Sequence, residues 1–155
     1  AQLDRFLLQI DVPYPDAEIE RKILIETTGT NTAEVSAVLN PDALMRMQHL
    51  VRSMPVGEKV LAAILELVRS ARPGASHDAR INEHVAWGPG PRAGQALMLA
   101  ARARALLRGR LAPAVDDVVA LARPALVHRM QLSFGARAEG LDVDTLVDAL
   151  AERAG

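Results

Sequence analysis

Apolar residues recur at helical spacing along most of the chain, and this pattern predicts a mainly α-helical protein. Start and stop signals agree with the spacing. Asn40, Pro41 and Asp42, for example, provide a cap, a first-turn proline and an acid directly before an apolar stripe. The predicted helices cover residues 16–27, 41–53, 57–71, 90–107, 115–130 with a kink at Pro124, and 143–150. Such a set favours a helical bundle.

The remaining segments break this period. Residues 6–12 are a short apolar run that Pro13 stops, which predicts one buried β-strand. A strand needs a sheet, and no other segment supplies one, so we expect the chain to be part of something longer. The runs 35–39 and 54–56 could pair as a minor two-stranded ribbon. The segments predicted to be irregular, because they have no period, are 73–86 and 131–140.

Composition describes one ordinary globular domain. The chain has 155 residues, of which 50% are hydrophobic and 24% charged, with a net charge of −1. No polybasic arm and no membrane-length apolar stretch occurs, so we expect no nucleic-acid partner and no membrane span. Cysteine is absent, which fits a reducing, cytoplasmic compartment. The four histidines are scattered without a ligand spacing, so no metal site is expected.

The most informative local signal is the segment Gly88-Pro89-Gly90-Pro91-Arg92-Ala93, which places Arg92 in the first turn of a helix. The free N–H groups and the dipole of a first turn favour anions, so an arginine there is unfavourable unless something negative binds nearby. A phosphate group would satisfy both the helix end and the guanidinium. A neighbouring carboxylate such as Glu83 would also satisfy the arginine, and the residues alone leave both readings open.

A second candidate is Arg5, which stands at the entrance of the predicted strand. An arginine that one subunit presents to the nucleotide of another would need such a placement. The residues by themselves favour a simpler interpretation, an ion pair between Asp4 and Arg5 at the surface.

The arginines of residues 102–110 form a basic run. The simplest interpretation is a solvated face that pairs with the acids of the last helix, and a nucleic-acid groove is the alternative. The arginines are Arg102, Arg104, Arg108 and Arg110, and the acids are Asp142, Asp144, Asp148 and Glu152. Paired acids at Asp116 and Asp117 are explained by helix capping.

No segment assembles a self-sufficient active site. The phosphate-loop pattern G-x-x-x-x-G-K-[ST], the nucleophile pattern G-x-S-x-G and the dinucleotide pattern G-x-G-x-x-G are all absent from the sequence. We therefore expect that the isolated chain is not an enzyme.

Six pieces of the sequence, taken in order, closely resemble the C-terminal part of MoxR-type AAA+ ATPases. The pieces are Gln2-Leu3-Asp4-Arg5-Phe6, Val12-Pro13-Tyr14-Pro15, Trp87-Gly88-Pro89-Gly90-Pro91-Arg92-Ala93, Ala101-Arg102-Ala103-Arg104-Ala105-Leu106-Leu107, Asp117-Val118 and His128-Arg129. The resemblance implies that residues 1–12 are the last strand of the αβα ATPase core and that residues 13–155 are its helical lid.

The resemblance also implies roles for individual residues. Arg92 falls on the sensor-2 arginine, which touches the nucleotide phosphates, and Arg5 is similar in context to the arginine finger that a ring subunit gives to its neighbour's ATP. Pro91 beside Arg92, and Tyr14 at the start of the lid, where adenine packing is expected by analogy, are the other implied nucleotide contacts. ATP and Mg²⁺ are the implied cofactors of a full-length parent, and none is expected to bind tightly to this chain alone.

Family members look like chaperones that use ATP to mature partner proteins or to insert metal cofactors into them. The resemblance implies a homo-oligomeric ring, expected to be a hexamer, and client proteins with von Willebrand factor A domains. Two alternatives stay open: a helical module that binds protein or nucleic acid, and the lid of a magnesium-chelatase-like AAA+ subunit.

Overall fold

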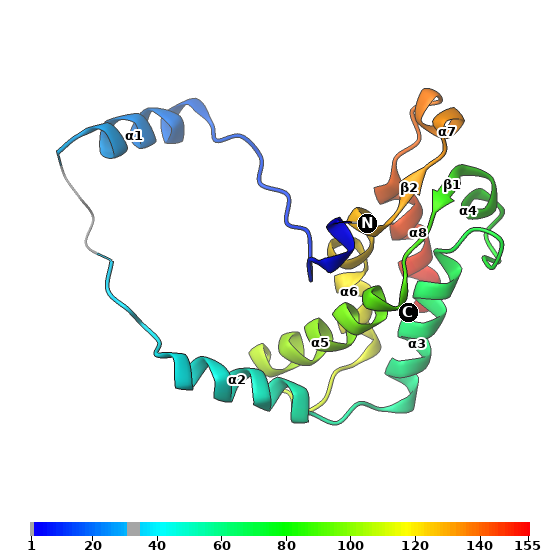
Figure 1. Ribbon diagram of the computed structural model, residues 1–155, viewed down its shortest axis with the longest axis horizontal. Coiled ribbons are helices and arrows are strands. Elements are labelled where there is room, and N and C mark those ends of the chain that lie inside the picture. The colour runs from blue at the N-terminus through cyan, green and yellow to red at the C-terminus, as the bar shows by residue number, and fades with distance from the viewer. Residues whose placement is uncertain (1, 31–34) are drawn as a thin grey trace.

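The computed structural model describes residues 2–30 and 35–155 and is mainly helical (Figure 1). The longer helices are α1 (Ala17–Thr28), α2 (Pro41–Ser53), α3 (Glu58–Ser70), α5 (Pro91–Leu107), α6 (Val115–Leu126) and α8 (Val143–Ala154). The short elements are η1 (Leu3–Arg5), α4 (Ala79–His84), β1 (Val85–Trp87), η2 (Val127–Arg129), β2 (Gln131–Leu132) and α7 (Phe134–Ala138). The helices predicted from spacing are thus confirmed to within a few residues, apart from the end of α6.

The core lies between α3, α5, α6 and α8. Helix α5 turns a row of buried alanines toward α6, and small side chains let the two helix backbones approach closely. Leu97 on α5 and Leu67 on α3 are fully buried in this core. Burying such a side chain stabilises the fold by roughly 1.5–3 kcal/mol. The resulting body is rigid enough to present the first turn of α5 at a fixed place.

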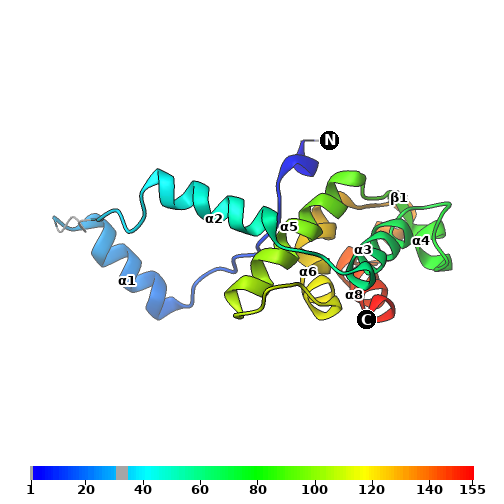
Figure 2. The same ribbon diagram turned by 90° about the horizontal axis from the view of Figure 1, so that it is seen from below.

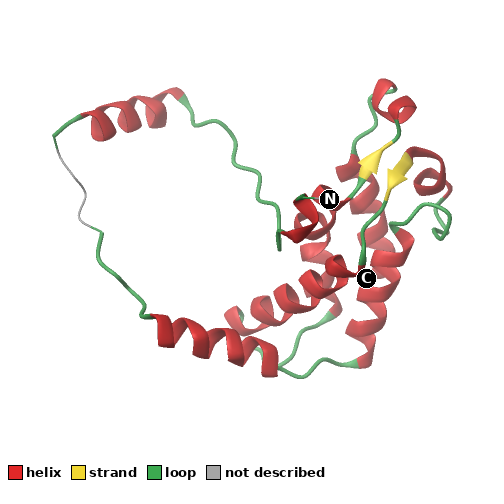
Figure 3. Ribbon diagram, viewed as in Figure 1, coloured by secondary structure: helices red, strands yellow, loops and turns green. Residues whose placement is uncertain are grey.

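A short antiparallel ribbon lies at one end of this body, with β1 paired to β2 (Figure 3). Val85 lies opposite Leu132, and Trp87 opposite Gln131. A minor ribbon was expected, but the predicted partners 35–39 and 54–56 were wrong, and neither segment forms a strand. The predicted irregular segments were also wrong in part, because 73–86 contains α4 and the start of β1 and 131–140 contains β2 and α7.

Helix α6 ends earlier than its apolar spacing predicts. Pro124 lies in its last turn, and after Leu126 the chain tightens into the 3₁₀ turn η2. Proline removes one N–H from the helical ladder, which makes a nearby helix end favourable. The end leaves the carbonyl groups of Pro124 and Ala125 free to accept hydrogen bonds from elsewhere in the chain.

The strand expected at residues 6–12 is not formed. Residues 3–5 make the 3₁₀ turn η1, and the following residues run extended along the lid without a strand partner. The N–H of Gln9 donates to the carbonyl of Pro124 at 2.8 Å. A strand requires a neighbouring strand to pair with, and the described chain offers only the end of α6 at this place.

Helices α1 and α2 form an arm that is exposed along its length. Neither helix has a buried residue, and α1 stands apart from the body in two perpendicular views (Figures 1 and 2). Capping explains where each begins: the side chains of Asp16 and Asn40 accept backbone N–H groups of Ile19 and Ala43. Helix α2 contacts α5, so one wall of the body is extended by this arm.

Candidate functional site

The first turn of α5 is held in place by the end of α3. A Cβ atom on Gly88 would lie 2.7 Å from the carbonyl oxygen of Ala71, so only glycine fits this close approach. Arg72 Nε donates to the carbonyl of Pro89 at 2.8 Å. These two contacts fix the segment that leads into α5, and with it the position of Arg92.

No side chain caps the start of α5. Its N-cap is Gly90, its first residue is Pro91, and its first turn contains no acidic residue. Pro91 has no N–H and the N–H of Ala93 donates to the carbonyl of Gly90 at 3.1 Å, so the N–H of Arg92 and the positive end of the dipole are left for an anion beside the Arg92 guanidinium. This arrangement favours an anion, as the sequence predicts.

Arg92 and Arg5 line the same pocket, a hollow of about 330 Å³ between η1, η2 and the first turns of α5. The side chains that line it are Asp4, Arg5, Leu7, Arg92, Gln95, Ala96, Leu99 and Arg129. We call this the arginine pocket. Three guanidinium groups face one carboxylate in it, so its net charge is positive and its chemistry suits a multiply charged anion.

Asp4 connects two of the three arginines. Its Oδ2 lies 3.5 Å from Nη1 of Arg92, and its Oδ1 accepts a 3.2 Å hydrogen bond from Nε of Arg129. The expected Asp4–Arg5 ion pair is therefore replaced by these two contacts. The guanidinium of Arg5 instead lies over the Phe6 ring, 5.3 Å from its centroid.

Arg92 does contact a carboxylate, as the alternative interpretation expects, but the carboxylate is that of Asp4 and not that of Glu83. Glu83 lies 3.8 Å from Nε2 of His84, whereas Arg92 contacts Asp4. That contact is loose, and the Arg92 side chain is 61% exposed. The Arg92 guanidinium is therefore free to leave Asp4 for a stronger anion that enters the arginine pocket.

Arg129 is the member of the arginine pocket whose role the sequence did not indicate. Its side chain is only 2% exposed, and its guanidinium donates to residues of the turn 4–7 and to the carbonyl of Ala125. The signals in the sequence are the pair His128-Arg129, one of the six pieces that carry the family resemblance, and the place of this pair between the apolar residues Val127 and Met130. A buried arginine must be hydrogen-bonded, but its partners, more than 120 residues away along the chain, cannot be read from spacing.

The basic run has a different role from the one expected. Arg104 and Arg110 bind the fully buried carboxylate of Asp117, and the N–H of Ala114 donates to the same carboxylate at 2.8 Å. We call this group the Asp117 clamp. The Arg110 guanidinium, together with these other donors, holds the pKa of the Asp117 carboxyl well below its usual range.

The acids of α8 pair elsewhere too. Asp144 lies 2.7 Å from Nη2 of Arg123, and Asp148 lies 3.5 Å from Nη1 of the same side chain. The prediction that these acids match the basic run was wrong, because Arg123 on α6 faces α8 directly. Arg104 and Arg110 of the basic run are thus bound within the fold, which leaves Arg102 and Arg108 for the alternative of a nucleic-acid groove.

Tyr14 is not brought to the arginine pocket. It is fully exposed in the extended segment before α1 and is not among the residues that line that pocket. Pro91 lies beside Arg92 in the first turn of α5, as its sequence position requires.

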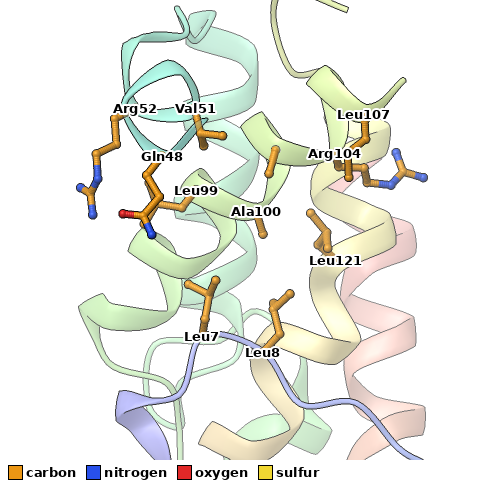
Figure 4. A pocket seen from close by; sticks show the side chains of 11 residues that line it. Leu7, Leu8, Gln48, Val51, Arg52, Leu99, Ala100, Arg104, Leu107 and Leu121 are labelled. Carbon is orange, nitrogen blue, oxygen red and sulfur yellow. The ribbon is translucent and has the colours of Figure 1, made fainter. Parts of the chain in front are cut away.

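A larger groove adjoins the arginine pocket and shares Leu7 and Leu99 with it (Figure 4). It has a volume of about 660 Å³ and lies between α2, α5, α6 and the N-terminal segment. Leu8, Val51 and Leu121 are among its apolar side chains, and few polar groups reach it. The groove suits apolar side chains of a partner surface rather than a charged ligand.

Across residues 2–30 and 35–155, no group of three or more histidine, cysteine or acidic side chains is arranged to hold a metal ion. None of the helices described by the structure is both long and apolar enough to cross a membrane.

Comparison with known proteins places these features in a family. The AAA lid domain family matches residues 77–150. The chain is 30% identical over 149 residues to the chaperone MoxR1 of Mycobacterium tuberculosis, and 32% identical over 148 residues to the uncharacterized protein YeaC of Bacillus subtilis. These matches cover 96% and 95% of this chain but 39% and 44% of the relatives, so the chain spans less than half of their length.

The fold has a counterpart among solved structures. A crystal structure of a candidate ATPase from Cytophaga hutchinsonii superposes with a TM-score of 0.85 at 24% identity. The match covers 97% of this chain and 46% of the other. At this identity the likeness establishes the fold, including the exposed arm, and leaves the chemistry of the site to the residues themselves.

Proposed function

We propose that this chain, which corresponds to the C-terminal, lid-bearing portion of a MoxR-type AAA+ ATPase, binds the phosphates of ATP through Arg92 and Arg5. The observation that carries the proposal is that both arginines line one positively charged pocket beside an uncapped helix start. Arg92 takes the sensor-2 role and Arg5 the arginine-finger role. ATP supplies the phosphoryl group that is transferred to water.

The residues present fit a nucleotide polyphosphate. The N–H of Arg92 in the first turn of α5 and the guanidinium groups of Arg92 and Arg5 can all donate hydrogen bonds, and phosphate oxygens accept them. Pro91 contributes the first position of the turn and needs no N–H there. The described residues contain no acidic cluster for Mg²⁺, so we assign its ligands to other parts of a full-length ATPase.

We further propose that both arginines act on the same nucleotide, that of a neighbouring subunit. If Arg5 is the arginine finger, it serves a nucleotide in trans, and the shared pocket brings Arg92 to the same phosphates. An arginine supplied in trans contributes about 10³ to 10⁵ in rate in well-studied NTPases, so hydrolysis would require the assembled ring. A homo-oligomer, expected to be a hexamer, is therefore part of the proposal.

The proposed biological role is ATP-driven, chaperone-like maturation of partner proteins. This maturation includes the insertion of metal cofactors, and the proposed clients carry von Willebrand factor A domains. The relative named as the chaperone MoxR1 supports the chaperone part of this role. The lid of a magnesium-chelatase-like subunit is the alternative within the AAA+ class, and the identity of the partner proteins separates the two. The proposed compartment is the cytoplasm.

The resemblance puts the boundary between core and lid after residue 12, and we propose to refine this boundary. Residues 10–12 are exposed, and in a full-length ATPase their backbone would pair with the core sheet. Residues 3–9 instead bind the lid through η2 and the end of α6.

The test is steady-state ATP hydrolysis by the full-length ATPase that contains this chain. We expect Arg5→Ala to lower kcat by about 10³-fold or more and Arg92→Ala to lower it by about 10²-fold or more. Arg108→Ala, an exposed arginine at the other end of α5, is the matched control and should keep wild-type turnover. Unchanged turnover in both Arg5→Ala and Arg92→Ala would refute the proposal.

A further inference from the structure

The turn that carries Arg5 is bound to the lid by one side chain. Arg129 has five N–H donors, and the structure uses the guanidinium for five hydrogen bonds. Four go to the turn 4–7, namely to the carboxylate of Asp4 and to the carbonyls of Asp4, Phe6 and Leu7, and one goes to Ala125 on α6. The side chain therefore joins two segments that are more than 120 residues apart in sequence.

Two neighbouring hydrogen bonds join the same two segments. His128 places Nε2 at 3.2 Å from the carbonyl of Phe6, and the N–H of Gln9 donates to the carbonyl of Pro124. These acceptors on α6 are available because the helix ends at Leu126 and leaves its last carbonyls free. The 3₁₀ turn and the end of α6 consequently form one hydrogen-bonded unit.

Within residues 2–30 and 35–155, no comparable group holds the Arg5 side chain from the lid. Its guanidinium contacts the ring of Phe6, its chain neighbour, so its position depends on the backbone of the turn. Because Arg129 fixes that backbone at Asp4, Phe6 and Leu7, it also fixes where Arg5 points relative to Arg92.

We propose that Arg129 is a positioning residue that attaches the Arg5 turn to the lid, so that Arg5 and Arg92 move together as one rigid unit with α5 and α6. The inference rests on the proposed function of Arg5. Lysine cannot replace Arg129, because an ammonium has three donors and no planar fork to reach all five acceptors. Positioning within a fraction of an ångström matters because catalysis by an arginine finger depends on its geometry.

The test is a double-mutant cycle in the full-length ATPase, with Arg5→Ala, Arg129→Lys and the double variant. We expect Arg129→Lys to lower kcat at least tenfold while KM for ATP changes less than about twofold. In the Arg5→Ala background the same substitution should cost no further turnover, because Arg129 acts through Arg5. A full multiplicative loss in that background, or a kcat within twofold of wild type for Arg129→Lys alone, would overturn the inference.

Arg110→Lys is the matched control. It changes an arginine that also binds a carboxylate and that links the loop after α5 to α6, but it does not touch the Arg5 turn. A general loss of stability would lower the melting temperature of both variants, whereas only Arg129→Lys should lower kcat. Equal losses of kcat in the two variants would overturn the inference in favour of a purely structural role.

A milder variant covers the case in which Arg129→Lys does not fold. His128→Ala removes only the contact to the Phe6 carbonyl, and we expect a two- to fivefold loss of kcat that disappears in the Arg5→Ala background. The absence of any loss would count against the inference. Wild-type turnover in Arg5→Ala itself would instead refute the proposed function, and the inference with it, so the two failures are distinguishable.

Discussion

Asp117 and Asp4 each contact two arginines, yet they have opposite roles. Asp117 is fully buried and receives tight hydrogen bonds from Arg104 and Arg110, at 2.6 and 2.8 Å from the latter. Asp4 is one-third exposed and holds Arg92 only loosely. Burial makes the first group a fixed part of the fold, whereas exposure leaves Arg92 in the second group available for a ligand.

The contrast follows from the energetics of charge. A buried charge must keep all its partners, since removing one leaves an uncompensated ion in a poor solvent. An exposed pair contributes little, because water solvates either partner when the two separate. The same residue types therefore form a structural clamp at Asp117 and an exchangeable contact between Asp4 and Arg92. The exchangeable contact lies beside the start of α5, which favours anions.

The largest expected effect that tests this contrast is the loss of stability in Asp117→Asn. Removing the negative charge leaves Arg104 and Arg110 without their counter-ion, and we expect the free energy of unfolding to fall by about 3–5 kcal/mol. Asp148→Asn, at a half-exposed carboxylate on α8, should cost less than about 1 kcal/mol. Urea denaturation of the two variants checks the difference, and similar costs for both would break the comparison.

The free energy of unfolding should depend on pH in the acid range, because buried carboxylates that bind arginine resist protonation. Hydrogen bonds from Arg80 lower the pKa of Asp78 to about 2, below the value near 3.9 of an unfolded carboxyl. The stabilisation from a lowered pKa is complete above pH 5 and is lost as the pH falls toward 2, because the unfolded chain binds the proton first. For Asp78 this amounts to about 2 kcal/mol.

Unfolding free energies measured between pH 7 and 2.5 check this expectation. Asp78→Asn and Asp117→Asn should each make the decline below pH 5 shallower. Asp11→Asn, an exposed carboxylate in the segment before α1, should leave the decline as steep as in the wild type. A decline that is unchanged in all three variants would contradict the assignment.

Asp4→Asn should change binding more than stability. The variant keeps an oxygen that accepts from Nε of Arg129 but removes the charge that attracts Arg92. We expect inorganic triphosphate to bind a few-fold more tightly, with less than about 1 kcal/mol change in the free energy of unfolding. Calorimetric titration measures the affinity, with Asp11→Asn as control, and weaker binding in Asp4→Asn would argue against a competing role for this carboxylate.

The smallest effect is expected at His128. Burial lowers the pKa of His128, and its Nε2 lies against the Phe6 carbonyl. A lowered pKa means that stability is lost as the pH falls through the usual histidine range, since the unfolded state takes up the proton more readily. Unfolding free energies at pH 7.5 and 5.5 should differ less in His128→Gln than in the wild type, and a larger difference would contradict this sign.

Sequence patterns predicted what depends on neighbours along the chain. Apolar spacing and caps located the main helices, and the misplaced charge of Arg92 in a first turn pointed to an anion site. Both are local signals that the chain carries within one or two helical turns.

Features that depend on distant partners were missed. The strands β1 and β2 have three and two residues, too short for any period, and their pairing joins Val85 to Leu132. The Asp117 clamp and the Arg129 contacts were missed because a charged residue in an apolar segment does not show from the sequence which distant group it binds. The strand expected at 6–12 failed for the opposite reason, since local propensity was right for an extended chain but, in the described part of the chain, no strand lies beside it to pair with.

The most direct test of the central claim uses mixed rings of the full-length ATPase. Subunits with a disabled phosphate loop, which keep both arginines, are mixed with Arg5→Ala subunits or with Arg92→Ala subunits, and ATP turnover is measured. Each component alone should be nearly inactive. If both arginines serve the nucleotide of the neighbouring subunit, as the shared pocket suggests, both mixtures should regain turnover to a similar extent. Recovery with Arg5→Ala but not with Arg92→Ala would contradict the account.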